Sequence, residues 1–125
     1  MQTEGPIFMM VDDMFFASKI RGAVNTVGRE VVSVRSLERI ASDTKPSLIL
    51  LDLNSTRLDP VETIQSLKSD ERFRDVPIVG FLSHVQVDLK RAAEDAGCDY
   101  VIPRSLFSQA LPQIVAGDLS MLRGR

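Results

Sequence analysis

The sequence predicts an α/β fold, a doubly wound sheet of five parallel strands with helices on both faces. Five short apolar runs recur along the chain, at residues 7–11, 30–34, 48–52, 77–82 and 100–102. Segments whose apolar residues have helical spacing separate these runs, and most runs end on polar or charged residues. Strands that alternate with helices in this way are typical of a parallel sheet covered on both faces.

The run at 48–52 is the expected central strand. Four consecutive aliphatic residues lead directly into Asp52, as in a strand buried on both faces. Open α/β sheets bind ligands at the carboxyl ends of their strands, so Asp52 lies where a site is expected. The alternative interpretation is that Asp52 opens a turn, which is a common role of aspartate.

The first half of the chain contains two further strands and two expected helices. The strand at 7–11 is followed by a helix whose apolar face comprises Phe16, Ile20, Val24 and Val27, with Gly28 at its end. The β-branched run at 30–34 is the second strand. Ser36 is a candidate cap for a short helix that carries Leu37, Ile40 and Ala41 inward, before Lys45-Pro46 breaks it.

The second half begins with a well-marked helix start. Asp59 and Pro60 have the preferred order of a cap residue followed by a proline, and Glu62 can complete the cap. The apolar face of this helix comprises Val61, Ile64 and Leu67. After the strand at 77–82, a further helix carries Leu89, Ala92, Ala93 and Ala96 inward and stops at Gly97.

The last helix follows the strand at 100–102. Leu111, Ile114 and Val115 are helically spaced, but proline does not fit the interior of a helix. The helix is therefore expected either to begin near Gln109 or to be kinked at Pro112. Gly117 marks its expected end, and residues 118–125 are expected to form a loose tail or a further amphipathic turn.

The composition is that of one globular domain, which we expect over residues 1–125 with a core at about 7–116. The chain has 125 residues, of which 44% are hydrophobic and 26% are charged. Its net charge of −2 leaves no basic excess to neutralise phosphates, which argues against direct nucleic-acid binding. The single cysteine, Cys98, excludes an internal disulfide, and no cluster of Cys and His offers a zinc site.

The same features predict a cytoplasmic protein without a membrane partner. The presence of a single cysteine fits a reducing compartment. The first residues lack the basic and apolar regions of a signal peptide, and no apolar run reaches the length that spans a membrane.

Polar side chains at four strand ends predict one shared site. In chain order they are Asp12 and Asp13, Asp52, Ser83 and His84, and Arg104. Carboxylate oxygens favour a hard cation such as Mg²⁺, and an aspartate can act as a nucleophile toward phosphorus. A hydroxyl and a basic side chain beside it can bind phosphoryl oxygens. Each residue has an ordinary structural role as well, and their joint occurrence is what favours a functional site.

The ordered motifs resemble a response regulator receiver domain of bacterial two-component signalling (CheY-like), over about residues 7–115. The matching residues are Val11-Asp12-Asp13, Leu50-Leu51-Asp52-Leu53, Asp59-Pro60-Val61-Glu62, Pro77-Ile78-Val79, Ser83, Ala96-Gly97 and Asp99-Tyr100-Val101. The resemblance implies a flavodoxin-like sheet with strand order 2-1-3-4-5. It also implies a histidine kinase or phosphotransfer protein as the phosphoryl donor.

The resemblance implies a role for each site residue. Asp52 would be the phosphoacceptor, and Mg²⁺ would be bound by Asp12, Asp13, Asp52 and the backbone carbonyl of Asn54. Ser83 would be the switch hydroxyl and Tyr100 the aromatic residue coupled to it. An output protein would bind the face formed by the fourth helix, fifth strand and fifth helix, and a homodimer is one option.

Two positions depart from the family pattern. The family ends its fifth strand with lysine and then proline, whereas this chain has Pro103-Arg104. Counting from Tyr100 puts Pro103 in the lysine position, and one extra residue puts Arg104 there. His84 follows the switch hydroxyl, either as a hydrogen-bonded imidazole beside the site or as a gate that contacts the phosphoryl group.

Three functions compete on these observations. The first is a stand-alone phosphoacceptor that loses its phosphate slowly and is not a conventional enzyme. The second is a degenerate receiver that binds proteins without phosphorylation, which the Pro103-Arg104 change favours. The third is an aspartate-based phosphatase, because residues 52–56 partly resemble the Asp-x-Asp-x-Thr signature of haloacid-dehalogenase enzymes. Those enzymes need a second carboxylate where this chain has Asn54.

Overall fold

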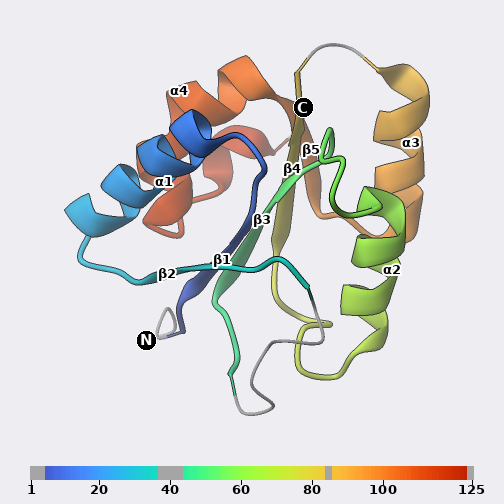
Figure 1. Cartoon of the computed structure of the whole chain (residues 1–125), viewed down its shortest axis with the longest axis horizontal. Helices are drawn as coiled ribbons and strands as arrows, with labels where there is room; N and C mark the ends of the chain where they lie inside the picture. Colours follow the sequence, from blue (N-terminus) through green and yellow to red (C-terminus); the bar gives the residue numbers. More distant parts are fainter. Residues whose placement is uncertain (1–4, 37–43, 84–85, 124–125) are drawn as a thin grey trace.

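The structure is a computed structural model that describes residues 5–36, 44–83 and 86–123. A parallel sheet with strand order β2-β1-β3-β4-β5 forms its middle layer (Figure 1). The strands are β1 (Ile7–Met10), β2 (Val31–Ser33), β3 (Leu48–Asp52), β4 (Ile78–Leu82) and β5 (Tyr100–Pro103). The helices are α1 (Met14–Thr26), α2 (Pro60–Ser69), α3 (Val87–Ala96) and α4 (Arg104–Val115). The predicted fold class and strand order are confirmed.

The helices cover both faces of the sheet in pairs. Alternate strand residues such as Met9, Leu50 and Phe81 pack with α1 and α4 in one core, and their neighbours pack with α2 and α3 in the other. Figure 1 shows the two helix pairs on opposite sides of the strands. Because β3 has helices on both sides, all five of its residues are buried, which agrees with its continuous aliphatic sequence.

Local sequence signals account for most helix ends. Asp59 caps α2 by accepting a hydrogen bond from the Glu62 backbone N–H at 3.1 Å, and Pro60 is the first helical residue. Gly97 follows α3 with a φ of 113°, a left-handed conformation that favours glycine. Val27 was expected on the apolar face of α1, but that expectation is wrong: it follows the last turn and is exposed.

Of the two alternatives for the last helix, the start near Gln109 is wrong. The helix begins at Arg104, and Pro112 lies within it. The physical reason is the buried face of the helix, since packing from Phe107 to Val115 outweighs the single backbone hydrogen bond that a proline removes. The short helix expected after Ser36 falls largely on residues 37–43, which lie outside the described residues.

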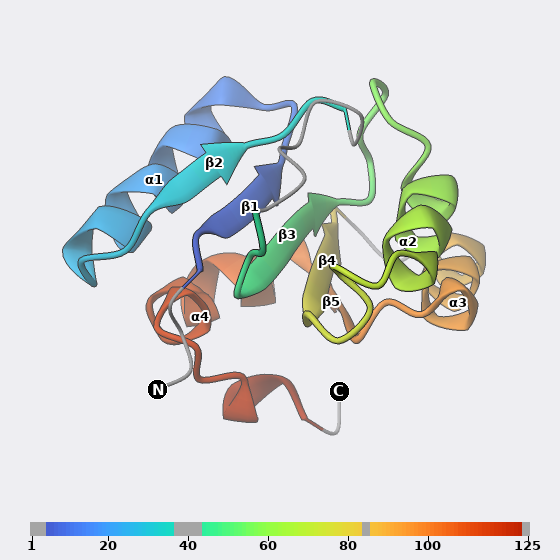
Figure 2. The ribbon, with the colours of Figure 1, turned by 90° about the horizontal axis from the view of Figure 1, so that it is seen from below.

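The end of the described chain forms a turn against the core. Ser120–Leu122 is a short 3₁₀ helix, and Leu122 is only 2% exposed within the core shared by α1 and α4. Figure 2 shows this turn beside α4. Of the two expectations for residues 118–125, the further turn is therefore correct over 120–122. In the described ranges, none of the helices is both long and apolar enough to cross a bilayer.

Candidate phosphoacceptor site

Parallel strand pairing brings the predicted site residues to one edge of the sheet. Asp52 is the last residue of β3 and pairs with Phe81 of β4. Leu82, the last residue of β4, pairs with Pro103 of β5. Because β1 also pairs with β3, the residues that directly follow β1 lie at the same edge.

Asp52 is the most buried carboxylate at this edge. The residue is 3% exposed, and its Oδ1 atom accepts a hydrogen bond from the Asn54 backbone N–H at 2.9 Å. Burial raises the pKa of Asp52 because it disfavours the charged form, and the nearby charge of Asp12 adds to this effect. The Asn54 hydrogen bond and the charge of Arg104 act in the opposite direction.

Asp12 is held by the loop between β3 and α2. Its Oδ1 atom accepts from the Ser55 hydroxyl at 2.9 Å, and its Oδ2 atom accepts from the Thr56 backbone N–H at 2.8 Å. Partial burial raises the pKa of Asp12, but these hydrogen bonds and the charge of Arg57 outweigh burial and hold the pKa below its ordinary value. Asp12 therefore joins β1 to the loop that follows the central strand.

Asp13 caps α1. Its Oδ1 atom accepts hydrogen bonds from the backbone N–H groups of Phe15 at 2.9 Å and Phe16 at 3.1 Å. The Phe16 N–H makes the largest contribution to lowering the pKa of Asp13, and Arg104 contributes further. The second carboxylate oxygen of Asp13 thus remains turned toward the guanidinium of Arg104, which donates to it at 3.4 Å.

Arg104 lies between two of the three carboxylates. Its Nη1 atom is 3.4 Å from Asp13 Oδ2, and its Nη2 atom is 3.8 Å from Asp52 Oδ2. The guanidinium also lies over the rings of Phe16 and Phe81, at 4.5 and 5.5 Å from their centroids. Its Nε atom is buried and has no hydrogen-bond partner among the described residues. The structure thus brings Arg104, and not Pro103, toward Asp52.

Asn54 ties the central loop to the end of β4. Its side-chain oxygen accepts from the Ser83 backbone N–H at 2.7 Å, and its amide nitrogen donates to Gln86 Oε1 at 2.8 Å. Ser83 is exposed directly after β4, at the same edge as Asp52. Tyr100 is the first residue of β5, at the far end of that strand, and is partly buried. The predicted gate residue His84 lies outside the described residues.

The predicted Mg²⁺ ligands have suitable chemistry but do not converge. Within residues 5–36, 44–83 and 86–123, no three Asp, Glu, His or Cys side chains gather closely enough to hold a metal ion. Asp12 is turned toward the Ser55–Thr56 loop, while Asp13 and Asp52 face Arg104. To be held by these carboxylates together, Mg²⁺ would have to displace contacts that Arg104 makes with Asp13 and Asp52.

Several contacts of the site were not anticipated from the sequence. They involve the side chains of Ser55, Thr56 and Gln86 and the rings of Phe16 and Phe81. The polar run directly after Asp52 is the sequence signal for the first two. The aromatic contacts have no local signal, because Phe16 and Phe81 come from distant parts of the chain.

The chain resembles response regulators in sequence and in fold. No family model matches it. The polar-differentiation response regulator DivK of Brucella ovis is 26% identical over 102 residues, which cover 78% of this chain and 83% of the relative. The phosphorylated cyanobacterial phytochrome response regulator RcpA has a TM-score of 0.75 and 28% identity, with 96% of this chain and 94% of that chain covered.

A third neighbour shares the fold alone. It is the receiver domain of the sensor histidine kinase PA1611 from Pseudomonas aeruginosa PAO1, described with a magnesium ion in its active-site cleft. Its TM-score is 0.76 and its identity 18%, and the match covers 93% of this chain and 98% of that chain. In its strand order and strand-end residues, and in these relatives, the chain is similar to CheY-like response regulator receiver domains.

Proposed function

We propose that this receiver domain accepts a phosphoryl group on Asp52 from the phosphohistidine of a histidine kinase or phosphotransfer protein. The observation that carries the proposal is the position of Asp52. It is a buried carboxylate at the end of the central strand, with the Arg104 guanidinium 3.8 Å from Oδ2. A nucleophile and a cation suited to phosphoryl oxygens thus lie side by side.

In the reaction, a carboxylate oxygen of Asp52 attacks phosphorus. A phosphorus–oxygen bond forms while the phosphorus–nitrogen bond of the donor breaks, and the imidazole leaves with the electron pair. The phosphoryl group adds negative charge close to Arg104, which can make paired hydrogen bonds to its oxygens. The Ser83 hydroxyl, at the neighbouring strand end, is the proposed donor to a further oxygen.

Mg²⁺ is the proposed cofactor, bound weakly. Asp12, Asp13, Asp52 and the Asn54 carbonyl would hold it, and a bound metal would neutralise charge on the transferred group. Weak binding follows from the arrangement of the carboxylates, because Asp13 and Asp52 already face the charge of Arg104.

Phosphorylation would alter the binding of an output protein. The proposed surface is formed by α3, β5 and α4, which are the fourth expected helix, the fifth strand and the fifth expected helix. Tyr100 of β5 is the residue proposed to couple this surface to Ser83. The proposal assigns this signalling to the cytoplasm, where the buried thiol of Cys98 stays reduced.

The proposal is tested by incubating the protein with acetyl phosphate and Mg²⁺ and measuring its intact mass. The wild type should gain a phosphoryl group, and Asp52→Asn should gain none because it lacks the nucleophile. Asp75→Asn, at an exposed carboxylate of the α2–β4 connection, is the matched control and should be labelled like the wild type. Equal labelling of Asp52→Asn and wild type would place the acceptor elsewhere.

The second candidate is a protein-interaction module that works without phosphorylation. Arg104 favours it, because one guanidinium faces both Asp13 and Asp52 and already balances part of their charge. If the wild type fails to bind beryllofluoride, a phosphoryl mimic, with Mg²⁺ present, this candidate replaces the first.

A further inference from the structure

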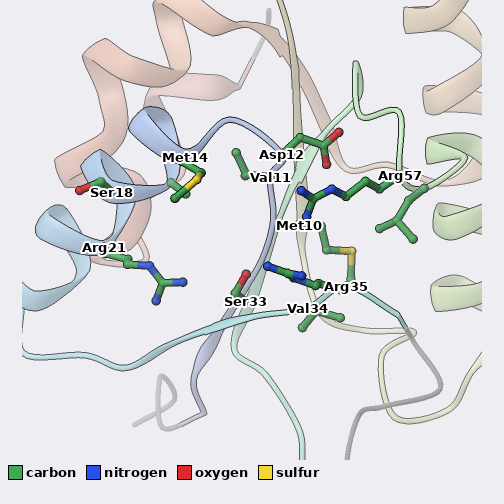
Figure 3. A pocket seen from close by; sticks show the side chains of 12 residues that line it. Met10, Val11, Asp12, Met14, Ser18, Arg21, Ser33, Val34, Arg35 and Arg57 are labelled. Atoms are coloured by element: carbon green, nitrogen blue, oxygen red, sulfur yellow. The ribbon is translucent and has the colours of Figure 1, made fainter.

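A cavity of about 330 Å³ lies beside the proposed phosphoacceptor site. Residues of α1, the ends of β1 and β2, and the β3–α2 loop line it (Figure 3). Asp52 is not among its lining residues. Its volume is in the range of sites that hold small molecules rather than a single ion. It lies at the carboxyl ends of strands, where open α/β sheets bind ligands.

Three arginines from separate elements face this cavity. Arg21 belongs to α1, Arg35 follows β2, and Arg57 belongs to the loop after β3. Figure 3 shows Arg35 and Arg57 extending toward α1 and Arg21 extending toward them. The lining thus concentrates positive charge on a chain whose net charge is −2.

The lining of this cavity offers little negative charge to balance these arginines. Asp12 is the one carboxylate among the lining residues, and its oxygens already accept hydrogen bonds from Ser55 and Thr56. Within the described ranges, the side chains of Arg21 and Arg35 make no salt bridge or hydrogen bond. Like charges around one cavity repel one another, so a bound anion would stabilise the arrangement.

The remaining lining residues add an apolar surface and two hydroxyl groups. Met10 and Val34 are buried at the cavity, and Met14 is 83% exposed beside it. Ser18 and Ser33 supply hydroxyl groups. The cavity therefore combines anion-binding groups with apolar contacts, which suits a ligand that has both a charged group and an apolar body.

We propose that this cavity binds a small phosphorylated molecule with a planar or apolar body, about the size of a mononucleotide. The guanidinium groups of Arg21, Arg35 and Arg57 bind the phosphoryl group through charge-assisted hydrogen bonds. Met10 and Met14 contact the body of the ligand, since methionine side chains adapt to irregular surfaces.

The proposal is tested by calorimetric titration with adenosine 5′-monophosphate and with phenyl phosphate. Both probes carry a phosphomonoester on a planar body. At least one should bind, while adenosine, phenol and inorganic phosphate should each bind at least tenfold more weakly. Arg21→Ala and Arg35→Ala should each weaken binding roughly tenfold, the scale of one charge-assisted contact.

Matched variants separate this site from the phosphoacceptor. Arg91→Ala removes an exposed arginine of α3 and should bind the probes like the wild type. Asp52→Asn should also retain binding, whereas it should lose phosphorylation. The proposal is wrong if neither phosphomonoester binds, if binding persists in both Arg21→Ala and Arg35→Ala, or if inorganic phosphate binds as tightly as the probes.

Discussion

At the scale of single residues, Arg104 determines the electrostatics of the site. Its guanidinium faces Asp13 and Asp52 and lies over Phe16 and Phe81. The two rings hold the guanidinium close to the carboxylates, because cations are attracted to aromatic faces. A guanidinium is also weakly hydrated, so it loses little hydration when it stacks on a ring. Lysine, a compact and strongly hydrated point charge, would not make these stacked and forked contacts equally well.

Replacing Arg104 should affect a phosphoryl mimic and the metal in opposite directions. Arg104→Ala should weaken beryllofluoride binding about tenfold, because one charge-assisted partner of the mimic is lost. The same change should strengthen Mg²⁺ binding in the absence of the mimic, because Asp13 and Asp52 lose a competing cation. Titrations followed by intrinsic fluorescence of Tyr100 or by calorimetry measure both affinities.

Arg104→Lys should retain part of the mimic binding, since it keeps the charge but not the fork. Arg57→Ala, at a basic residue of the β3–α2 loop, is the comparison and should bind the mimic like the wild type. Unchanged mimic binding in Arg104→Ala would remove Arg104 from the site.

Burial of Asp52 should make the stability effect of Asp52→Asn depend on pH. Because its pKa in the folded protein is raised above the ordinary value of 3.8, Asp52 favours folding most in acid, and this contribution is lost as pH rises through the raised pKa. Asparagine carries no charge at any pH. The variant should therefore be more stable than the wild type at neutral pH, by about 1 kcal/mol.

The gain should disappear well below pH 3.8, where Asp52 is protonated in both states. Urea unfolding of the two proteins across this pH range measures the difference. A difference that stays constant with pH would contradict the assigned burial effect.

At the scale of elements, α4 tolerates a proline because its buried face is extensive. Pro112 is exposed and has no N–H to donate to the carbonyl of Ser108, one turn earlier. The opposite face buries Phe107, Leu111 and Ile114 in the core. Tertiary packing thus maintains a helix that local preference alone would interrupt.

Pro112→Ala should stabilise the protein by roughly 1–3 kcal/mol, because alanine restores the missing hydrogen bond and favours the helix. Denaturant unfolding monitored by circular dichroism measures the change. Gln113→Ala, at the exposed neighbouring position, is the control and should change stability by less than about 0.5 kcal/mol. A destabilised Pro112→Ala would mean that the proline has a packing role that its exposure does not reveal.

At the scale of the whole molecule, both faces of the sheet are closed by tightly packed cores. Gly80 of β4 illustrates the packing, because an added Cβ atom would lie 3.0 Å from Leu53 and 3.1 Å from the Cys98 sulfur. Cys98 is 7% exposed, and burial raises the pKa of its thiol to about 12. The thiol is therefore protonated and shielded in the native protein.

Thiol labelling should report unfolding of the entire domain. Cys98 should react with a disulfide reagent at neutral pH at least a hundredfold more slowly in the native protein than in guanidinium chloride, because only the exposed thiolate reacts. The exposed variant Ser120→Cys, made in a Cys98→Ala background, is the control and should react quickly in both conditions. Rapid native labelling of Cys98 would show that this core opens locally.

The sequence by itself determined the order of elements, the central buried strand and the placement of Asp52 at its end. These features depend on residues that are adjacent in the sequence. A continuous aliphatic run, for example, is enough to indicate a strand that is buried on both faces. Helix starts such as Asp59-Pro60 are likewise local, since a cap bonds to backbone groups two or three residues away.

The tertiary structure alone decided how the side chains at the sheet edge are directed. The sequence left both Pro103 and Arg104 as candidates for the basic position, and it predicted that three carboxylates would share one metal site. Arg104 reaches the site because α4 begins directly after β5 and because distant aromatic rings support its guanidinium. The carboxylates diverge because Asp12 binds Ser55 and Asp52 faces Arg104, and packing brings these partners together from distant parts of the sequence.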